Sequence, residues 1–406
     1  MTVRQRSSIV GLGCVSALGL DAAEFWRSLK AGVSGIAPLR LERTDHRVAT
    51  MAAQVPPYDP SDRFTPVQRV ALEPFGQYAL LAAREAVSDS GLKPDQIGGH
   101  RTAIIMGTGA AGNRSLAEAA RRFYAARQRM LPSVVPAFMP NAAASQMAME
   151  LNVHGPSFAV SSACASGNHA VALGHMLLAS GMVDRVIAGA SEAVVHPASL
   201  VAWEALRILS PDACRPFSRD RNGIVLGDGA AVFVLERAVD AHRRRARVLA
   251  DVSGVGMTAD AGDLLRPDRR RAAETMAAAL RDASLRPEDI GYINAQGGGT
   301  VIGDIVESEA IEDVFGDHAR RLAVSSTKSM HGHALGAASA LELAATVLAL
   351  HNQMVPPTAN WLGRDDRCRL DYVPNEARPM AFRAALTNAF AFGGLNAVLA
   401  VTAPEA

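Results

Sequence analysis

The feature that most constrains the fold is an alternation of short apolar runs with longer helical runs, which passes along the chain twice. Runs such as Arg101 to Gly107 and Ile290 to Ala295 predict strands, and runs such as Ser166 to Ser180 predict helices. Strands separated by helices are typical of parallel sheets with helices packed on their faces. A basic stretch near His242 to Arg247 lies between the passes. The pattern therefore predicts two similar α/β halves fused over one core.

The 406 residues are enough for two such halves. The predicted strands are Ser8 to Gly13, Arg101 to Gly107, Ser157 to Ser162, Arg185 to Ala190, Ala230 to Glu236, Ala246 to Val255, Ile290 to Ala295, Leu322 to Ser325, Ala384 to Asn388 and Ala397 to Thr402. The predicted helices are Gln77 to Gly91, Ser166 to Ser180, Ala272 to Ala283, Asp304 to Phe315 and Ala334 to Leu350.

Composition narrows the class of protein. A net charge of +1 gives no excess of either sign, so nucleic acid and anionic membranes are not expected partners. No apolar run is expected to reach the ~18 residues of a membrane helix, and the N-terminus lacks the features of a signal peptide. The four cysteines form no CxxC pair, which argues against a disulfide framework or a zinc site. We therefore expect a cytoplasmic protein.

One strand-to-helix turn carries a cysteine among small residues. It reads Ser161-Ser162-Ala163-Cys164-Ala165-Ser166-Gly167, with the helix beginning directly after it. Unpaired N–H groups and the positive dipole end of a helix stabilise a thiolate at such a place. Small neighbours leave room for a substrate. The pattern indicates a nucleophile at Cys164, and the alternative is a buried structural cysteine.

A second turn, Ser325-Ser326-Thr327-Lys328-Ser329-Met330-His331-Gly332-His333, also leads from a strand into a helix. A histidine there can donate to a developing oxyanion, and a lysine can orient it electrostatically. For Lys328 or His333 alone, a surface loop residue is the alternative. Cysteine, histidine and lysine at matching turns together favour thioester chemistry. A metal site is not predicted, because no histidine pair has ligand spacing with a carboxylate partner.

Two more loops are weaker signals. The segment Asn294-Ala295-Gln296-Gly297-Gly298-Gly299-Thr300 is glycine-rich and permits close approach to a ligand. Asp304 and Glu307 follow it, three apart on one helix face. The segment Asn388-Ala389-Phe390-Ala391-Phe392-Gly393-Gly394 predicts a tight loop whose phenylalanines could also be ordinary core.

With these segments in view, the chain resembles the β-ketoacyl-acyl-carrier-protein synthases of the type II, elongating branch of the thiolase-like condensing enzymes. The resemblance covers nearly the whole chain. It rests on Gly11-Leu12-Gly13, Ser162-Ala163-Cys164-Ala165-Ser166-Gly167, Arg215-Pro216-Phe217, Gly227-Asp228-Gly229-Ala230, Ser325-Ser326-Thr327-Lys328-Ser329-Met330, Gly332-His333, Tyr372-Val373-Pro374-Asn375 and Phe392-Gly393-Gly394. It implies an α/β fold, the thiolase-like duplicated five-layer α-β-α-β-α arrangement. The halves are expected at 1–245, with the nucleophile, and 246–406.

The resemblance also implies residue roles. Cys164 matches the nucleophile that accepts an acyl chain from the phosphopantetheine arm of an acyl carrier protein. His333 matches a histidine that polarises the extender thioester, and Lys328 a lysine near it. Asp304 and Glu307 match acidic residues that interact with that lysine. No cofactor is implied beyond the arm that carries the substrate, and no metal.

Further matches concern substrate contacts. Phe392 matches a gate beside the nucleophile, with Phe390 in the same loop, and Thr300 matches a threonine that touches the pantetheine arm. Ala110 stands where elongating relatives commonly carry a larger residue at the end of the acyl tunnel. The pattern breaks at Gln296, where the family has a histidine that supports decarboxylation. Glutamine can donate a hydrogen bond but cannot carry a proton at neutral pH.

Three functions stay open at this point. The first is decarboxylative condensation of an acyl-Cys164 thioester with malonyl-acyl-carrier protein, in fatty-acid or polyketide-type specialised metabolism. The second is a non-elongating, carrier-protein-dependent acyltransferase. The third is the chain-length-factor-like partner subunit of a ketosynthase heterodimer, which the intact Cys164 disfavours. The expected partners are an acyl carrier protein and, in a homodimer or heterodimer, a second ketosynthase-like subunit.

Overall fold

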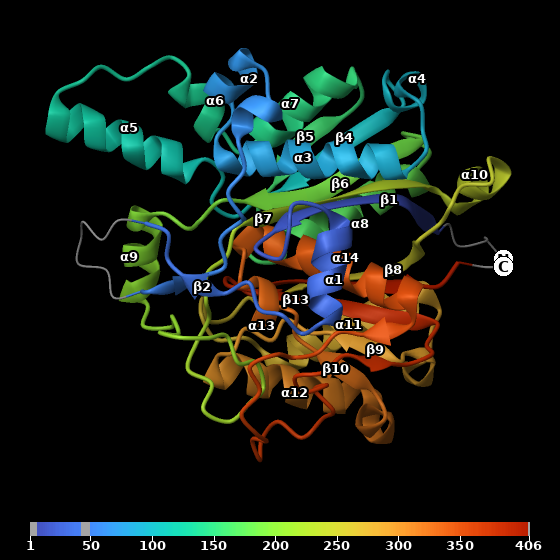
Figure 1. Ribbon diagram of the computed structural model, residues 1–406. Helices are drawn as coiled ribbons and strands as arrows, with labels where there is room; N and C mark the ends of the chain where they lie inside the picture. Colours follow the sequence, from blue (N-terminus) through green and yellow to red (C-terminus); the bar gives the residue numbers. More distant parts are fainter. Residues whose placement is uncertain (1–5, 42–48, 405–406) are drawn as a thin grey trace.

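The computed structural model describes residues 6–41 and 49–404 (Figure 1). Ten strands form one continuous sheet in the order β10-β9-β13-β14-β8-β1-β7-β6-β4-β5. These strands are β1 Ser7–Ser16, β4 Thr102–Gly107, β5 Ser157–Val160, β6 Arg185–Glu192, β7 Gly229–Arg237, β8 Ala250–Ala259, β9 Tyr292–Asn294, β10 Ala323–Ser325, β13 Ala384–Ala391 and β14 Leu395–Thr402. Two small ladders pair β2 Ala37–Pro38 with β3 Met51–Ala52, and β11 Met354–Val355 with β12 Arg378–Pro379.

The sheet consists of two halves with the same strand order. In chain order, each half begins with its innermost strand, β1 or β8, and these two strands pair over Ser7–Ile9 and Ala250–Val252. The second strand of each half, β4 or β9, then pairs in parallel with the third, β5 or β10, and with the fourth, β6 or β13. The fifth, β7 or β14, lies between the fourth and the first. The expected internal duplication is therefore confirmed in the topology.

The expectation of parallel sheets is only partly right. The strands β4, β5 and β6, and likewise β9, β10 and β13, are parallel, because helical crossovers join them. The last strand of each half instead runs antiparallel to both of its neighbours. In the second half it returns through the tight turn at Phe392 to Gly394, which reverses the chain without a helix. Strand β8 also begins at Ala250, four residues after the predicted start.

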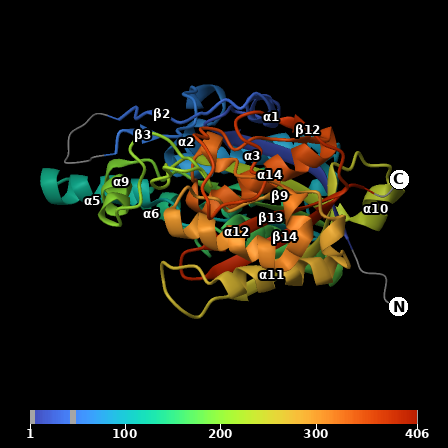
Figure 2. The same cartoon turned by 90° about the horizontal axis from the view of Figure 1, so that it is seen from below.

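The longer helices are α1 Ala22–Lys30, α3 Pro74–Asp89, α5 Asn113–Ala126, α7 Ala142–Leu151, α8 Ser166–Ala179, α9 Pro197–Ala205, α11 Arg269–Ala283, α12 Val301–Phe315 and α14 Ala338–Asn352. The shorter ones are α2 Pro66–Ala71, α4 Pro94–Ile97, α6 Val134–Phe138, α10 Ala238–Arg243 and α13 Lys328–His331. Helix α3 packs on β1, β6 and β7, and α11 packs on β8 and β14. Helices α8 and α14 pack on each other between the half-sheets (Figure 1). Figure 2 shows α14 again, from below. The expected five-layer α-β-α-β-α arrangement is confirmed.

Glycines in the first strand of each half let a helix lie against the strand backbone. A β-carbon on Gly13 would lie 2.0 Å from the carbonyl oxygen of Ala82 in α3. In the second half, a β-carbon on Gly256 would lie 2.1 Å from the carbonyl oxygen of Thr275 in α11. Both distances are below any real contact, so only glycine fits, and the same device positions the outer helix in each half.

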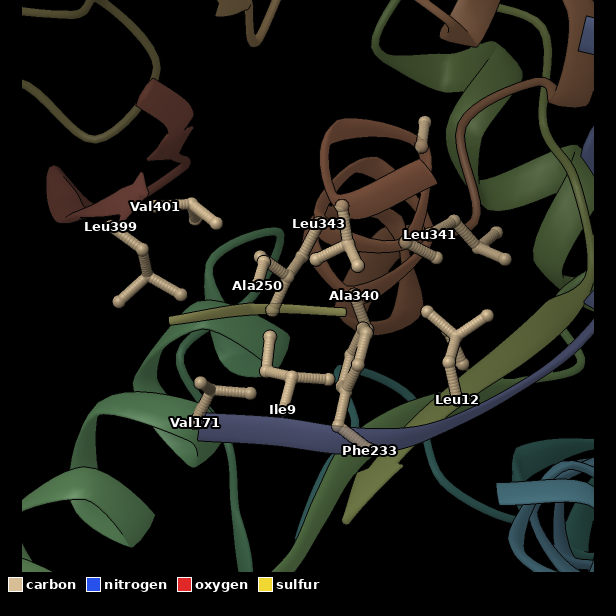
Figure 3. Packing of buried hydrophobic residues seen from close by; sticks show 14 of the residues in the cluster. Ile9, Leu12, Val171, Phe233, Ala250, Ala340, Leu341, Leu343, Leu399 and Val401 are labelled. Carbon is tan, nitrogen blue, oxygen red and sulfur yellow. The ribbon is translucent and has the colours of Figure 1, made fainter. Parts of the chain in front are cut away.

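The main core lies between the halves and draws on both (Figure 3). Ile9 and Phe233 come from the first half-sheet, Leu399 and Val401 from the second, and Leu341 from α14. All five side chains are buried. Because one cluster spans the junction, the halves bury apolar surface together instead of forming separate cores.

The expectation that no segment is long and apolar enough for a membrane is wrong by length and composition. The helical segment Leu335–Asn352 spans 18 residues and passes that test, but 83% of it is buried inside the protein. A core helix of a large domain has the same composition. Instead of the continuous helix predicted from Ala334, the segment starts with a 3₁₀ turn, Leu335–Ala337, before α14.

Candidate active site

Cys164 lies in the tight turn between β5 and α8. Ala163 adopts a left-handed conformation, with φ at +49°, which is uncommon for a residue with a side chain. The hydroxyl of Ser166 holds the turn by donating to the carbonyl of Ala163 at 2.7 Å and accepting from the N–H of Ser162 at 2.9 Å. The turn thus places Cys164 immediately before the N-terminus of a helix that is buried between the half-sheets.

The protonation state of Cys164 differs from the expectation of a stabilised thiolate. Its side chain is 5% exposed, and burial raises the pKa of the thiol to about 11. The ammonium of Lys328 and the backbone N–H of Phe392 act in the opposite direction and lower this pKa, but burial outweighs them. At neutral pH Cys164 is therefore a thiol. The loss of hydration destabilises the thiolate more than Lys328 and the N–H of Phe392 stabilise it.

Lys328 is fully buried and forms an ion pair with Glu342 of α14. Its ammonium also donates to the backbone oxygen of Gln296 at 2.6 Å and lies 3.4 Å from that residue's side-chain oxygen. Burial raises the pKa of Glu342 to about 7, although Lys328 lowers it. Sequence reasoning missed Glu342. The available signal is a lone carboxylate within an otherwise apolar helix, since buried carboxylates usually have a specific partner.

His333 is buried, and its ring orientation follows from a backbone contact. Its Nδ1 accepts from the N–H of Leu335 at 3.2 Å, so the ring proton of the neutral form resides on Nε2. Burial lowers the pKa of His333 well below its ordinary value, and the positive charge of Lys328 lowers it further. His333 is therefore neutral at pH 7, with Nε2 as a hydrogen-bond donor.

Asp304 and Glu307 hold the glycine-rich loop that contains Gln296. The carboxylate of Glu307 accepts from the N–H groups of Gln296 and Gly297, both at 2.8 Å. The carboxylate of Asp304 accepts from the N–H groups of Phe217, at 2.7 Å, and Gly299, at 3.1 Å.

For these two acidic residues the structure shows partners other than the expected Lys328. The hydrogen-bonded carboxylate partner of Lys328 is Glu342. Asp304 and Glu307 accept from the backbone groups named above, and each also has a side-chain partner: Arg221 lies 3.6 Å from Asp304, and Asn388 donates to Glu307 at 3.1 Å. Lys328 acts on Glu307 electrostatically, by lowering its pKa.

Residues from all of these turns line one cavity of about 360 Å³. The predicted residues in its lining are Cys164, Gln296, Thr300, Asp304, Glu307, His333, Phe390 and Phe392. Thr300 also caps α12 by accepting from the N–H of Gly303 at 3.2 Å. Arg266 adds a charge to the lining, and the remaining wall is mostly apolar.

One wall of the cavity comes from α9 and the segment after it, through Trp203, Leu206 and Ile208. The ring of Trp203 stacks on Phe392, with centroids 5.9 Å apart and planes inclined by 20°. Sequence reasoning missed this wall, because nothing in the sequence of α9 separates it from an ordinary apolar helix.

Two predicted residues lie outside the cavity lining. Lys328 does not line the cavity but contacts Gln296, which does, through the backbone and side-chain oxygens of that residue. Ala110 packs against an apolar cluster that includes Val194 and Leu335, and its N–H donates to the carboxylate of Glu192 at 3.2 Å. The cavity lining therefore includes Trp203 but not Ala110. The described residues, 6–41 and 49–404, contain no cluster of three or more metal-binding side chains.

Two protein-family models match the chain, one in each half. The family model described as "Beta-ketoacyl synthase, N-terminal domain" matches residues 5–241. The model described as "Beta-ketoacyl synthase, C-terminal domain" matches residues 249–361.

Curated relatives match along almost the full length. Nodulation protein E of Rhizobium sp. (strain N33) is 43% identical over 397 residues, which cover 98% of this chain and 98% of the relative. The 3-oxoacyl-acyl-carrier-protein synthase 2 of Coxiella burnetii is 36% identical over 408 residues, which cover 98% and 99%.

Solved structures agree in fold. The ishigamide ketosynthase/chain length factor superimposes with a TM-score of 0.95 at 35% identity, over 99% of this chain and 100% of that chain. A type II polyketide synthase complex, of an acyl-carrier protein with its ketosynthase bound to the hexaketide, includes a chain that superimposes with a TM-score of 0.91. That match has 29% identity and covers 98% of this chain and 100% of the other.

Proposed function

Since the chain belongs to the β-ketoacyl synthase family and is a condensing acyltransferase of fatty-acid or polyketide-type metabolism, we propose that Cys164 is the residue that carries the acyl group. The observation that supports this most is the cavity itself. It brings the sulfur-bearing turn, Gln296 and His333 together in one largely apolar space. Such a space can hold an acyl chain and the end of a carrier arm.

The proposed reaction has two steps. In the first, the Cys164 sulfur attacks the acyl thioester of a carrier protein. An acyl-Cys164 thioester forms, and the carrier's thiol leaves with the proton of Cys164. In the second, malonyl-carrier protein loses carbon dioxide, and its C2 attacks the acyl carbon. A carbon–carbon bond forms, the Cys164 thiolate leaves, and the product is a 3-oxoacyl-carrier protein.

His333 and Gln296 would stabilise the charge that develops on the malonyl thioester oxygen. The Nε2–H of neutral His333 is one donor. Lys328 can only donate hydrogen bonds, so the side-chain oxygen of Gln296 faces it and the NH₂ group is left to face substrate. Two neutral N–H donors can polarise a thioester without transferring a proton. This supports decarboxylation with Gln296 in place of the histidine that the resemblance implies.

A second candidate is a carrier-dependent acyltransferase that loads Cys164 but does not decarboxylate, and it is favoured because Gln296 cannot carry a proton at neutral pH. A chain-length-factor-like role in a heterodimer is the third. Its support is the likeness to the ishigamide ketosynthase/chain length factor, and the presence of Cys164 disfavours it.

The proposed partners are an acyl carrier protein, whose phosphopantetheine arm delivers the substrate, and a second subunit. Exposed apolar side chains support the second subunit. Helix α5 projects from the body of the protein (Figure 1) and exposes Phe123 and Tyr124, and the edge strand β5 exposes Phe158. A sheet edge and exposed aromatic rings are each typical of an interface. The partner can be a second copy or a related chain, and we propose the cytoplasm as the site of action.

The two halves divide the chemistry in this proposal. Residues 1–245 supply the acyl acceptor Cys164, and residues 246–406 supply Gln296, Lys328 and His333. The boundary is supported by the family models, which end at 241 and begin again at 249.

One experiment separates the three candidates. The protein is incubated with acyl- and malonyl-carrier proteins, intact masses of both proteins are measured, and carbon dioxide release is followed. An adduct that is lost in Cys164→Ala but kept in Cys14→Ala, together with release of carbon dioxide and an extended carrier product, supports condensation. Cys14 is a matched control because it is equally buried, outside the cavity lining.

The other outcomes are equally informative. An adduct without carbon dioxide release selects the acyltransferase. The absence of any adduct, combined with co-purification of a second ketosynthase-like subunit, selects the partner role and contradicts both enzymatic proposals.

A further inference from the structure

Glu192, the last residue of β6, is a fully buried carboxylate beside the loops of the site. Its carboxylate accepts from the N–H of Gly109 at 2.6 Å and from the N–H of Ala110 at 3.2 Å. It also accepts from the hydroxyl of Thr108 at 3.2 Å and from the N–H of Gly336 at 3.1 Å. The donors come from both halves of the protein, because Gly336 belongs to the 3₁₀ turn Leu335–Ala337.

The two loops touch at the point where Glu192 binds them. A β-carbon on Gly336 would lie 2.2 Å from the backbone nitrogen of Gly109, so the two backbones are in direct contact. Their N–H groups point to the same carboxylate. Without an acceptor there, two buried donors would face each other unpaired, which is an unfavourable arrangement. An apolar side chain could fill the space but could not satisfy these donors.

The turn held by Glu192 is also the turn that orients His333. Leu335, next to Gly336, adopts a left-handed conformation with φ at +40°, which few residues with side chains adopt. In that conformation its N–H donates to Nδ1 of His333 at 3.2 Å. This hydrogen bond keeps the ring proton on Nε2, the donor end that the reaction needs. The path from Glu192 through Gly336 and Leu335 to His333 is therefore continuous.

We propose that Glu192 is a positioning residue for the reaction: it holds the 3₁₀ turn in the conformation that keeps Nε2 of His333 protonated and directed at the substrate. Glu192 lies outside the cavity lining, so it acts through His333 and not on the substrate itself. The proposal rests on the proposed function, because His333 matters for the extender step only if that step occurs.

The consequence is a separation of the two chemical steps. Loading of Cys164 requires the turn between β5 and α8, whereas decarboxylation requires the His333 donor. Loss of Glu192 should therefore slow carbon dioxide release from malonyl-carrier protein more than it slows acylation of Cys164. A displacement of about 1 Å in a catalytic donor can cost about 100-fold in rate.

The test uses Glu192→Gln, which keeps the shape of the side chain but replaces one acceptor oxygen with a donor. The matched control is Glu85→Gln. Glu85 is a partly buried carboxylate, which accepts from the N–H groups of Cys14 and Ala22, outside the cavity lining. Circular dichroism and thermal melting establish that both variants are folded.

Two readouts decide the proposal. First, acylation of Cys164 is followed by intact mass and carbon dioxide release is followed separately. In Glu192→Gln we expect release to fall about 10- to 100-fold, with acylation changed less than about threefold. Second, the tautomer of His333 is read by nuclear magnetic resonance on protein with isotope-labelled histidine. The His333→Gln spectrum identifies its signal among the 11 histidines. We expect the Nε2-protonated form in the wild-type chain and in Glu85→Gln, and a mixture in Glu192→Gln.

An unchanged tautomer in folded Glu192→Gln would overturn the proposal, and so would equal losses in both steps. The proposed function can fail separately, because a wild-type protein that never releases carbon dioxide contradicts condensation while the resonance measurement still decides the role of Glu192.

Discussion

The buried ion pair between Lys328 and Glu342 can be tested by a double-mutant cycle. Both side chains are 0% exposed, so removal of one partner leaves an uncompensated group inside the protein. We expect Lys328→Met and Glu342→Leu each to lose about 3–5 kcal/mol in the free energy of unfolding. Entropy of unfolding scales with chain length, so for 406 residues this loss corresponds to a fall in Tm of about 3–6 °C.

The double variant should be more stable than the sum of the singles implies. Replacing a buried pair by apolar side chains of similar volume is close to neutral. The double variant still loses the hydrogen bond from Lys328 to the backbone oxygen of Gln296, at 2.6 Å. This loss lowers the free energy of unfolding by about 1 kcal/mol. The coupling free energy is therefore expected to be about 3 kcal/mol or more.

The loss of stability in Lys328→Met should depend on pH. Burial raises the pKa of Glu342 from its ordinary value to about 7, so in the folded protein this carboxyl keeps its proton at pH values where a free carboxyl has already lost it. Such a group favours folding most fully below its ordinary pKa, and this contribution is lost as pH rises through about 7. In Lys328→Met the carboxyl can take up a proton and become neutral. The destabilisation should therefore be smaller at pH 6 than at pH 8.

Thermal melting and urea unfolding of the four chains measure the cycle. The matched control is the exposed pair Arg121 and Glu118, whose side chains are 66% and 41% exposed, where coupling should not exceed about 0.5 kcal/mol. A coupling of less than about 1 kcal/mol at Lys328 and Glu342 would refute the argument, because the two side chains would then be independent.

Further predictions concern the cavity. Gln296→His should speed carbon dioxide release from malonyl-carrier protein, and an unchanged or slower rate would contradict the role given to the amide. Because burial raises the pKa of Cys164 to about 11, alkylation by iodoacetamide should rise about tenfold per pH unit from pH 7 to 10; a plateau below pH 9 would show a thiolate at lower pH. Trp203→Ala should change the accepted acyl chain length, because it opens the wall and removes the stack on Phe392. Ala110→Ile, outside the cavity lining, should leave the chain-length profile nearly unchanged, and product analysis by mass spectrometry compares the two.

The fold was largely predictable because its main signals are local. Each buried strand is a short apolar run, and the helices carry the period that lets them pack on a sheet. The duplication was visible because the same alternation restarts near residue 246. The antiparallel placement of β7 and β14 was not predictable, because strand direction in a sheet depends on which neighbour a strand meets, and one sequence does not contain that information.

The candidate site, like the fold, has features that the sequence predicts and features that depend on the tertiary structure. The sequence alone determined that a cysteine stands before a helix at Cys164, and that Lys328 and His333 lie in a similar turn, since small residues and glycines at strand ends are local features. Only the tertiary structure decided that Lys328 pairs with Glu342, that Asp304 and Glu307 bind backbone N–H groups, and that Glu192 joins the two halves. A buried charge is stabilised by whichever donors the packing brings to it, and those donors lie far away along the chain.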